Sequence, residues 1–93
     1  MRLSYQEQES VDVLEKEVVD DLCDLVVFND EVNTFEHVIN TLMKVCNHSV
    51  EQAEQCTLLI HYKGKCTVKN GSFEELRPMC ENILSVGITA TVI

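Results

Sequence analysis

The sequence predicts an α+β domain whose elements follow the order strand, helix, helix, strand, helix, strand, with one sheet covered on one side by helices. Short β-branched runs alternate with longer segments in which apolar residues recur at helical spacing. Three capping patterns, each a small polar residue followed three positions later by Glu or Gln, mark helix starts. The 93 residues, 45% of them hydrophobic, are enough for one modest core and too few for a second.

The first half of the chain predicts one strand and two helices. Residues 25–28 form a short apolar, β-branched run that is consistent with a buried strand. A helix follows, and either Asn33 or Thr34 can cap its N-terminus. The second helix begins after Ser49, which opens another capping pattern, and Gly64 is well placed to end it.

The second half predicts a strand, a helix and a final strand. Residues 65–69 alternate apolar and polar side chains, as an exposed strand does, and an Asn-Gly turn signal follows them. Helical spacing over residues 73–84 predicts the third helix. Pro78 conflicts with that helix because it lacks an N–H, so we expect either a separate first turn or a kink. The β-branched residues 88–93 predict the last strand.

The negative charge of the chain is concentrated near its N-terminus. Residues 1–24 hold eight acids against Arg2 and Lys16, which gives -6 of the net charge of -9. We therefore expect residues 1–22 to be a flexible acidic tail and residues 23–93 to be the folded domain. A chain this acidic, without a basic face, argues against nucleic-acid binding, which needs clustered Lys and Arg.

The five cysteines are an odd number, are widely spaced and include no Cys-x-x-Cys pair. We expect free and mostly buried thiols, with no metal and no cofactor. The first ten residues lack the apolar core of a signal peptide, and no apolar run approaches the length of a membrane span. These features predict a cytoplasmic protein without a membrane partner.

Two polar clusters predict a small binding site. Asn29, Asp30 and Glu31 come directly after the first strand, and His61 closes an apolar helix about thirty residues later. Amide and carboxylate oxygens, together with an unprotonated imidazole nitrogen, suit a positively charged ammonium group. Taken alone, the acidic cluster is more often a group of charges at a helix start, and His61 is more often a histidine satisfied at a helix end.

The string FNDEVNTFEHVINTL, followed by HYKGKC, resembles the ClpS family of adaptors for the bacterial ATP-dependent Clp protease over residues 25–92. Family members carry Asn-Asp-Asp, Tyr-Thr-Pro-Met, a helix and His-Tyr-x-Gly-Lys in this order and at nearly this spacing. The resemblance implies a two-layer fold in which three helices cover a three-stranded antiparallel sheet, as in the C-terminal domain of the ribosomal stalk protein.

The resemblance also implies a function. The chain would be a monomeric adaptor without enzymatic activity that binds N-degrons, which are proteins with a free α-amino group and a bulky hydrophobic first residue. It would deliver them to the N-terminal domain of a Clp AAA+ unfoldase of the ClpA or ClpC type. The alternative is a protein-interaction domain of the stalk-protein fold that binds no N-degron. A thiol nucleophile paired with a histidine is the enzymatic alternative, and no motif supports it.

Carried over by position, the resemblance assigns nine residues to the ligand site and two to the unfoldase contact. The residues implied at the α-ammonium group are Asn29, Asp30, Glu31 and His61. Those implied in the hydrophobic pocket are Phe35, Val38, Thr57, Ile60 and Ile88. The unfoldase contact is implied for Glu74 and Arg77.

The chain departs from the family pattern at several of these positions. Glu31 stands where the family has Asp, and it is one methylene longer. Asn33 and Thr34 replace Thr-Pro, whereas Phe35 and Thr57 each replace a Met. We therefore expect a different clamp geometry and a different preference among bulky first residues.

Overall fold

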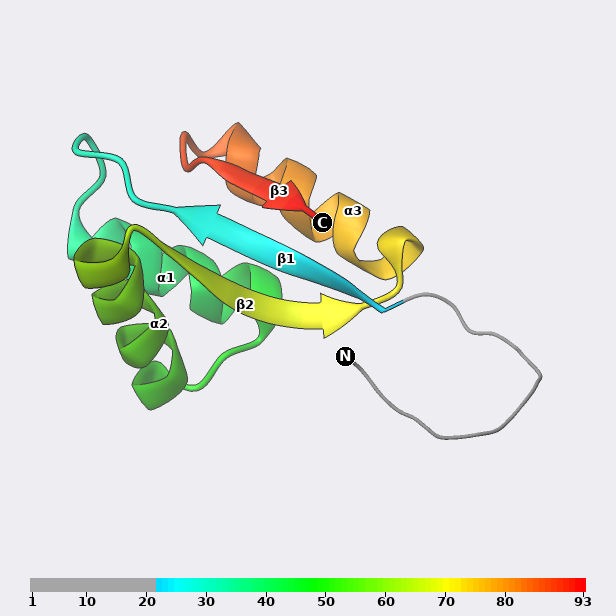
Figure 1. Ribbon diagram of the computed structural model, residues 1–93. Coiled ribbons are helices and arrows are strands. Elements are labelled where there is room, and N and C mark those ends of the chain that lie inside the picture. Colours follow the sequence, from blue (N-terminus) through cyan, green and yellow to red (C-terminus); the bar gives the residue numbers. More distant parts are fainter. Residues whose placement is uncertain (1–21) are drawn as a thin grey trace.

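The computed structural model describes residues 22–93, so the predicted tail lies, apart from Leu22, outside the described residues. The elements follow the predicted order (Figure 1). They are β1 (Cys23–Phe28), α1 (Phe35–Cys46), α2 (Val50–Lys63), β2 (Lys65–Gly71), α3 (Phe73–Ser85) and β3 (Ala90–Val92). Within residues 22–93, none of the helices has the length and apolar character that crossing a bilayer requires.

The three strands form one antiparallel sheet, as predicted, and their order in the sheet is β2-β1-β3. Val27, near the end of the central strand, pairs with Cys66 on one side and Ala90 on the other. The register of β1 against β2 shifts between Leu25 and Val26. The middle residues of β1, Leu25, Val26 and Val27, are apolar and buried, and the two valines are β-branched, which suits a central strand with neighbours on both edges.

The core lies between the sheet and the helices. Leu25 and Val27 alternate with Val26 along β1, so both point to the same face of the sheet. All three helices pack apolar residues against this face, among them Leu42 of α1 and Ile83 of α3. Figure 1 shows α1 and α2 together on the β2 side of the molecule and α3 along β3.

Local hydrogen bonds explain where the helices begin. Thr34 caps α1 by accepting a hydrogen bond from the amide of His37 at 3.0 Å, so Thr34, and not Asn33, is the cap. Ser72 and Glu75 form a reciprocal capping box at the start of α3, with both hydrogen bonds at 3.1 Å.

One of the two alternatives expected at Pro78, a separate first turn, is wrong, and so is the expected start of the last strand. α3 is a single helix that runs through Pro78, so its first turn is not separate; the capping box holds that turn from its N-terminal side. The last strand begins at Ala90, two residues later than predicted. Gly87 turns the chain with a φ of 90°, and the amide of Ile88 still donates to the carbonyl of Ile83 at the end of α3, at 3.3 Å.

Candidate functional site

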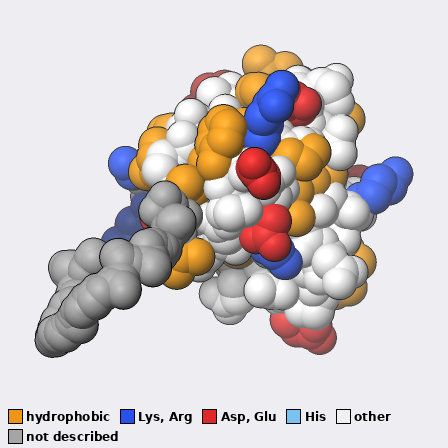
Figure 2. Space-filling model, turned by 90° about the vertical axis from the view of Figure 1, so that its right-hand side faces the viewer, with side chains coloured by type: hydrophobic (Ala, Val, Ile, Leu, Met, Phe, Trp, Pro, Cys, Tyr) orange, Lys and Arg blue, Asp and Glu red, His pale blue; other side chains and the backbone are white. Residues whose placement is uncertain are grey.

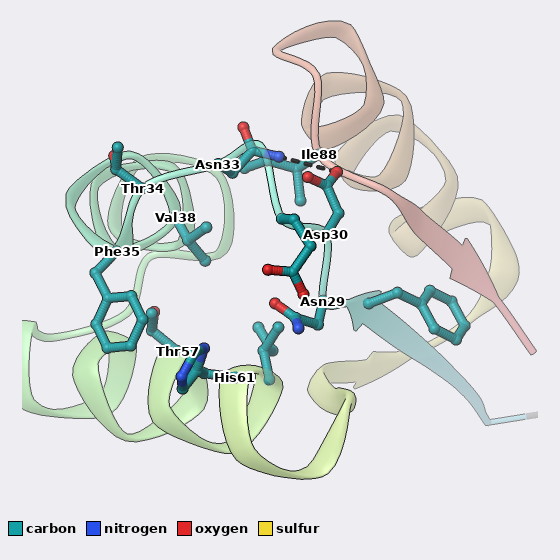
Figure 3. Close-up of a pocket in the computed structure, with 12 residues that line it drawn as sticks. Asn29, Asp30, Asn33, Thr34, Phe35, Val38, Thr57, His61 and Ile88 are labelled. Atoms are coloured by element: carbon teal, nitrogen blue, oxygen red, sulfur yellow. Dashed lines mark hydrogen bonds between the residues drawn. The ribbon is translucent and has the colours of Figure 1, made fainter.

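A pocket of about 180 Å³ opens where the end of β1, the start of α1, the second half of α2 and the segment before β3 meet (Figure 3). All nine residues that the sequence assigned to the ligand site line it. Phe28, Asn33 and Thr34 also line it and were not predicted as site residues. The fold thus brings three separate parts of the sequence to one cavity.

One side of the pocket is the acidic loop, residues 29–33, between β1 and α1. The amide of Asn29 donates to the carbonyl of Gly64 at 2.8 Å, which fixes the start of the loop against the end of α2. The carboxylate of Asp30 accepts from the amide of Val32 at 2.9 Å, a turn typical of Asp. Asp30 is therefore held within the loop. Glu31 is exposed at the same cavity.

Aromatic side chains lie at the mouth of the pocket. The rings of Phe35 and His61 meet edge to face, with centroids 5.1 Å apart. Figure 3 shows both rings on one side of the opening, Phe35 from α1 and His61 from α2. Phe35 is 44% exposed although it is a large apolar residue. A ligand can therefore cover apolar surface here that the protein itself leaves in water.

The inner wall of the pocket is apolar and belongs to the core. Val38, Ile60 and Ile88 line the cavity and are also buried members of the hydrophobic core. Thr57 is buried beside them, and its hydroxyl donates to the carbonyl of Ala53 at 2.7 Å. That bond satisfies the hydroxyl within α2, so Thr57 brings no unpaired donor to the wall. The wall is preformed because the packing of the domain holds it.

The two residues implied at the unfoldase contact lie elsewhere. Glu74 and Arg77 line a groove of about 340 Å³ on α3, together with Phe73, Pro78 and Glu81. Gly71 pairs with Cys23, so α3 starts beside the first residue of β1, whereas the pocket lies at the last residue of β1. Figure 2 looks at this end of the molecule and shows hydrophobic side chains interleaved with charges of both signs.

The cysteines lie outside the pocket and carry free thiols. Burial raises the pKa of the Cys46 thiol, and likewise that of Cys66, from 9.0 to about 11. Nucleophilic cysteines require a lowered pKa, so these thiols are protonated and unreactive at neutral pH. Within residues 22–93, no group of three or more His, Cys, Asp and Glu side chains is arranged to hold a metal ion.

The other two histidines bind backbone carbonyls. His48 is buried and donates through Nε2 to the carbonyl of Val68 at 2.8 Å. His37 donates through Nε2 to the carbonyl of Val86 at 2.9 Å. Neither lines the pocket, whereas His61 does.

Comparisons with known proteins agree with this fold. The family model of the ATP-dependent Clp protease adaptor protein ClpS matches residues 19–90. The ClpS adapter protein of Thermosynechococcus vestitus is 36% identical over 66 residues, which cover 70% of this chain and 70% of that protein. The ClpS of Streptomyces coelicolor is 28% identical over 67 residues, 72% of this chain and 70% of that protein.

Two further likenesses are more distant in kind. A segment of the E3 ubiquitin-protein ligase UBR1 of Drosophila melanogaster is 35% identical over 71 residues, which cover 71% of this chain and only 4% of that ligase. The structure of Agrobacterium tumefaciens ClpS2 bound to L-phenylalaninamide superposes with a TM-score of 0.67 at 17% identity, over 77% of this chain and 94% of that one. It supports the fold. Because the family model spans most of the sequence, the chain belongs to the ClpS family of adaptor proteins of the ATP-dependent Clp protease.

Proposed function

We propose that this protein is a non-catalytic adaptor that binds N-degrons and delivers them to a Clp AAA+ unfoldase. The observation that carries the proposal is the composition of the pocket, in which acceptors for an ammonium group stand beside a preformed apolar wall. An N-degron presents the same two features side by side, because its α-ammonium group and its first side chain are attached to the same carbon atom.

The polar side of the pocket suits the α-ammonium group. That group has one positive charge and three hydrogens to donate. The amide oxygen of Asn29, the carboxylate of Glu31 and an unprotonated nitrogen of His61 can accept them. Each hydrogen bond to a charged group contributes about 1.5–3 kcal/mol. An N-terminal acetyl group removes both the charge and two of the donors.

The apolar wall suits a single bulky side chain. A volume of about 180 Å³ is small beside the roughly 300–1,000 Å³ of pockets for drug-sized ligands. Burying one Leu or Phe side chain contributes about 1.5–3 kcal/mol, and association costs several kcal/mol, so we expect micromolar affinity. L-Phenylalaninamide, the ligand of the Agrobacterium ClpS2 structure, also combines a free α-amino group with an apolar ring.

Delivery needs a second surface that stays free while the pocket is occupied. The groove that contains Glu74 and Arg77 meets this requirement because it lies at the opposite end of β1 from the pocket. A strand of six residues is about 20 Å long. We assign this groove to the N-terminal domain of the unfoldase, in keeping with membership of a Clp adaptor family.

A pair of peptides tests the proposal. Fluorescence anisotropy of the full chain should detect micromolar binding of a peptide with a free N-terminal Phe or Leu and none of its N-acetylated form. A peptide with N-terminal Ala is the control for the apolar wall, and it should bind weakly. In a second stage, the chain should accelerate degradation of a Phe-first substrate by reconstituted Clp protease. Equal binding of the free and acetylated peptides would refute N-degron recognition and favour an interaction domain of another kind.

A further inference from the structure

Asn33 connects two segments of the pocket that are far apart in the sequence. Its side-chain Nδ2 donates to the carbonyl of Gly87 at 2.9 Å, across 54 positions of the chain. The same nitrogen donates to the carboxylate of Asp30 at 3.1 Å. An amide nitrogen has two hydrogens, so each bond uses one of them. Figure 3 shows Asn33 beside Ile88, with its bond to Asp30 as a dashed line.

The connection joins the two chemical halves of the site. Asp30 belongs to the acidic loop, and its other carboxylate oxygen already accepts from the amide of Val32. Gly87 directly precedes Ile88, which is 3% exposed and forms part of the apolar wall. One side chain therefore sets the distance between the groups suited to an ammonium ion and the wall suited to a side chain.

A second hydrogen bond holds the turn between α3 and β3, which contains Gly87. His37 donates to the carbonyl of Val86, the residue before Gly87, at 2.9 Å. Two consecutive carbonyls of the α3–β3 turn are thus held, one by the acidic loop through Asn33 and one by the first turn of α1 through His37. Gly87 lies in this turn with a φ of 90°, and because glycine has no side chain to restrict its backbone, bonds from outside the turn help to hold it.

We propose that Asn33 is a positioning residue that holds the acidic loop and the Ile88 wall at a fixed separation, so that one ligand can satisfy both. The inference rests on the proposed N-degron binding. Helix capping does not explain Asn33, because Thr34 caps α1. The side-chain nitrogen of Asn33 donates to Asp30 and Gly87 and cannot accept from an ammonium group, so these two bonds act on a ligand through the loop and the turn.

The variant Asn33→Asp separates positioning from direct contact. The substitution keeps the shape and adds an acceptor charge, but it removes both donors and places two carboxylates together at residues 30 and 33. A residue that bound the ammonium group directly would bind it at least as well after this change. If Asn33 positions the loop and the turn, the substitution should instead weaken the binding of a Phe-first peptide by about tenfold.

Three control variants complete the experiment. Asn33→Ala removes the bonds without adding charge and should also weaken binding. Asn40→Asp adds the same charge at an exposed site of α1 outside the pocket and should leave affinity within about twofold. Val68→Ala lowers stability from a buried position on β2 that does not line the pocket, and it should not change affinity at a temperature where the protein stays folded.

Hydrogen exchange gives a readout that needs no ligand. The amides of Gly87 and Ile88, which donate to carbonyls at the end of α3, should exchange faster in Asn33→Ala than in the wild-type chain. Unchanged exchange, or Asn33→Asp binding as tightly as the wild type, would overturn the positioning role and leave the proposed function intact. Failure of the wild-type chain to bind the free peptide would overturn the proposed function, and this role with it.

Discussion

The variant Glu31→Gln tests whether a full negative charge contributes to ligand binding. Glu31 is exposed and lines the pocket, whereas the neighbouring Asp30 is engaged in hydrogen bonds within the loop. Gln has nearly the same shape and still offers one acceptor oxygen. The substitution therefore removes the charge while it preserves the size of the side chain.

The expected loss follows from the position of Glu31. Two unit charges about 4 Å apart interact by about 1 kcal/mol in water and about 4 kcal/mol at an effective dielectric constant of 20. Glu31 is exposed, so the value lies near the lower limit. A change of about 1–1.4 kcal/mol corresponds to roughly five- to tenfold weaker binding of a peptide with a free N-terminus.

Fluorescence anisotropy at low ionic strength measures this loss, with Glu36→Gln as the matched control. Glu36 is exposed in the first turn of α1 and lies outside the pocket. Glu36→Gln changes the net charge by the same amount as Glu31→Gln without altering the pocket. The difference between Glu31→Gln and wild type should shrink as salt rises from about 0.01 M to about 1 M, where screening shortens from about 30 Å to about 3 Å. Equal affinities for Glu31→Gln and wild type, or equal losses in the two variants, would refute the charge contribution of Glu31.

Two predictions concern stability. Burial raises the pKa of the Cys46 thiol from 9.0 to about 11. Above pH 9 the unfolded state can release this proton while the folded state still holds it, so the free energy of unfolding is unaffected below pH 9 and falls as the pH rises toward 11. In urea unfolding, the free energy of unfolding of Cys46→Ala should therefore fall less over this pH range than that of the wild type. An equal fall in the two proteins would contradict the raised pKa of Cys46. Gly64→Ala should lower stability by about 1–2 kcal/mol in thermal unfolding, because residue 64 ends α2 with a φ of 93°. Apart from its chain neighbours, no atom lies within 4 Å of the added Cβ, so the expected cost is backbone strain alone, and an unchanged melting temperature would contradict it.

The order of the elements could be predicted because its signals are local. Apolar periodicity and the capping patterns involve residues three or four positions apart, and these determine where a helix begins. The choice between Asn33 and Thr34 was different, since both have side chains that can cap. The structure has Thr34 as the cap, whereas the side-chain nitrogen of Asn33 donates to the carbonyl of Gly87, a partner 54 positions away that no local pattern indicates.

The nine site residues could be named because the family pattern fixes their order and spacing. Their convergence on one cavity is a property of the fold. Asn33 could not be recognised as part of the pocket, since nothing in its neighbourhood indicates a bond to the α3–β3 turn. The late start of the last strand at Ala90 could likewise not be predicted, because the β-branched run includes Ile88, whose amide instead bonds to the end of α3.

The departures from the family pattern bear on how the acidic loop is kept in shape. Where the family has Thr-Pro, this chain has Asn33 and Thr34. Thr34 has a φ of -78°, close to the angle of about -65° that a proline ring imposes, and the capping bond to the amide of His37 accompanies it. Asn33 contributes the bonds to Asp30 and Gly87. A covalent restraint of the backbone is thus replaced by side-chain hydrogen bonds, each of which a single substitution can remove. Recognition in this chain should depend on Asn33 more strongly than a proline-restrained loop depends on the residue at the same place.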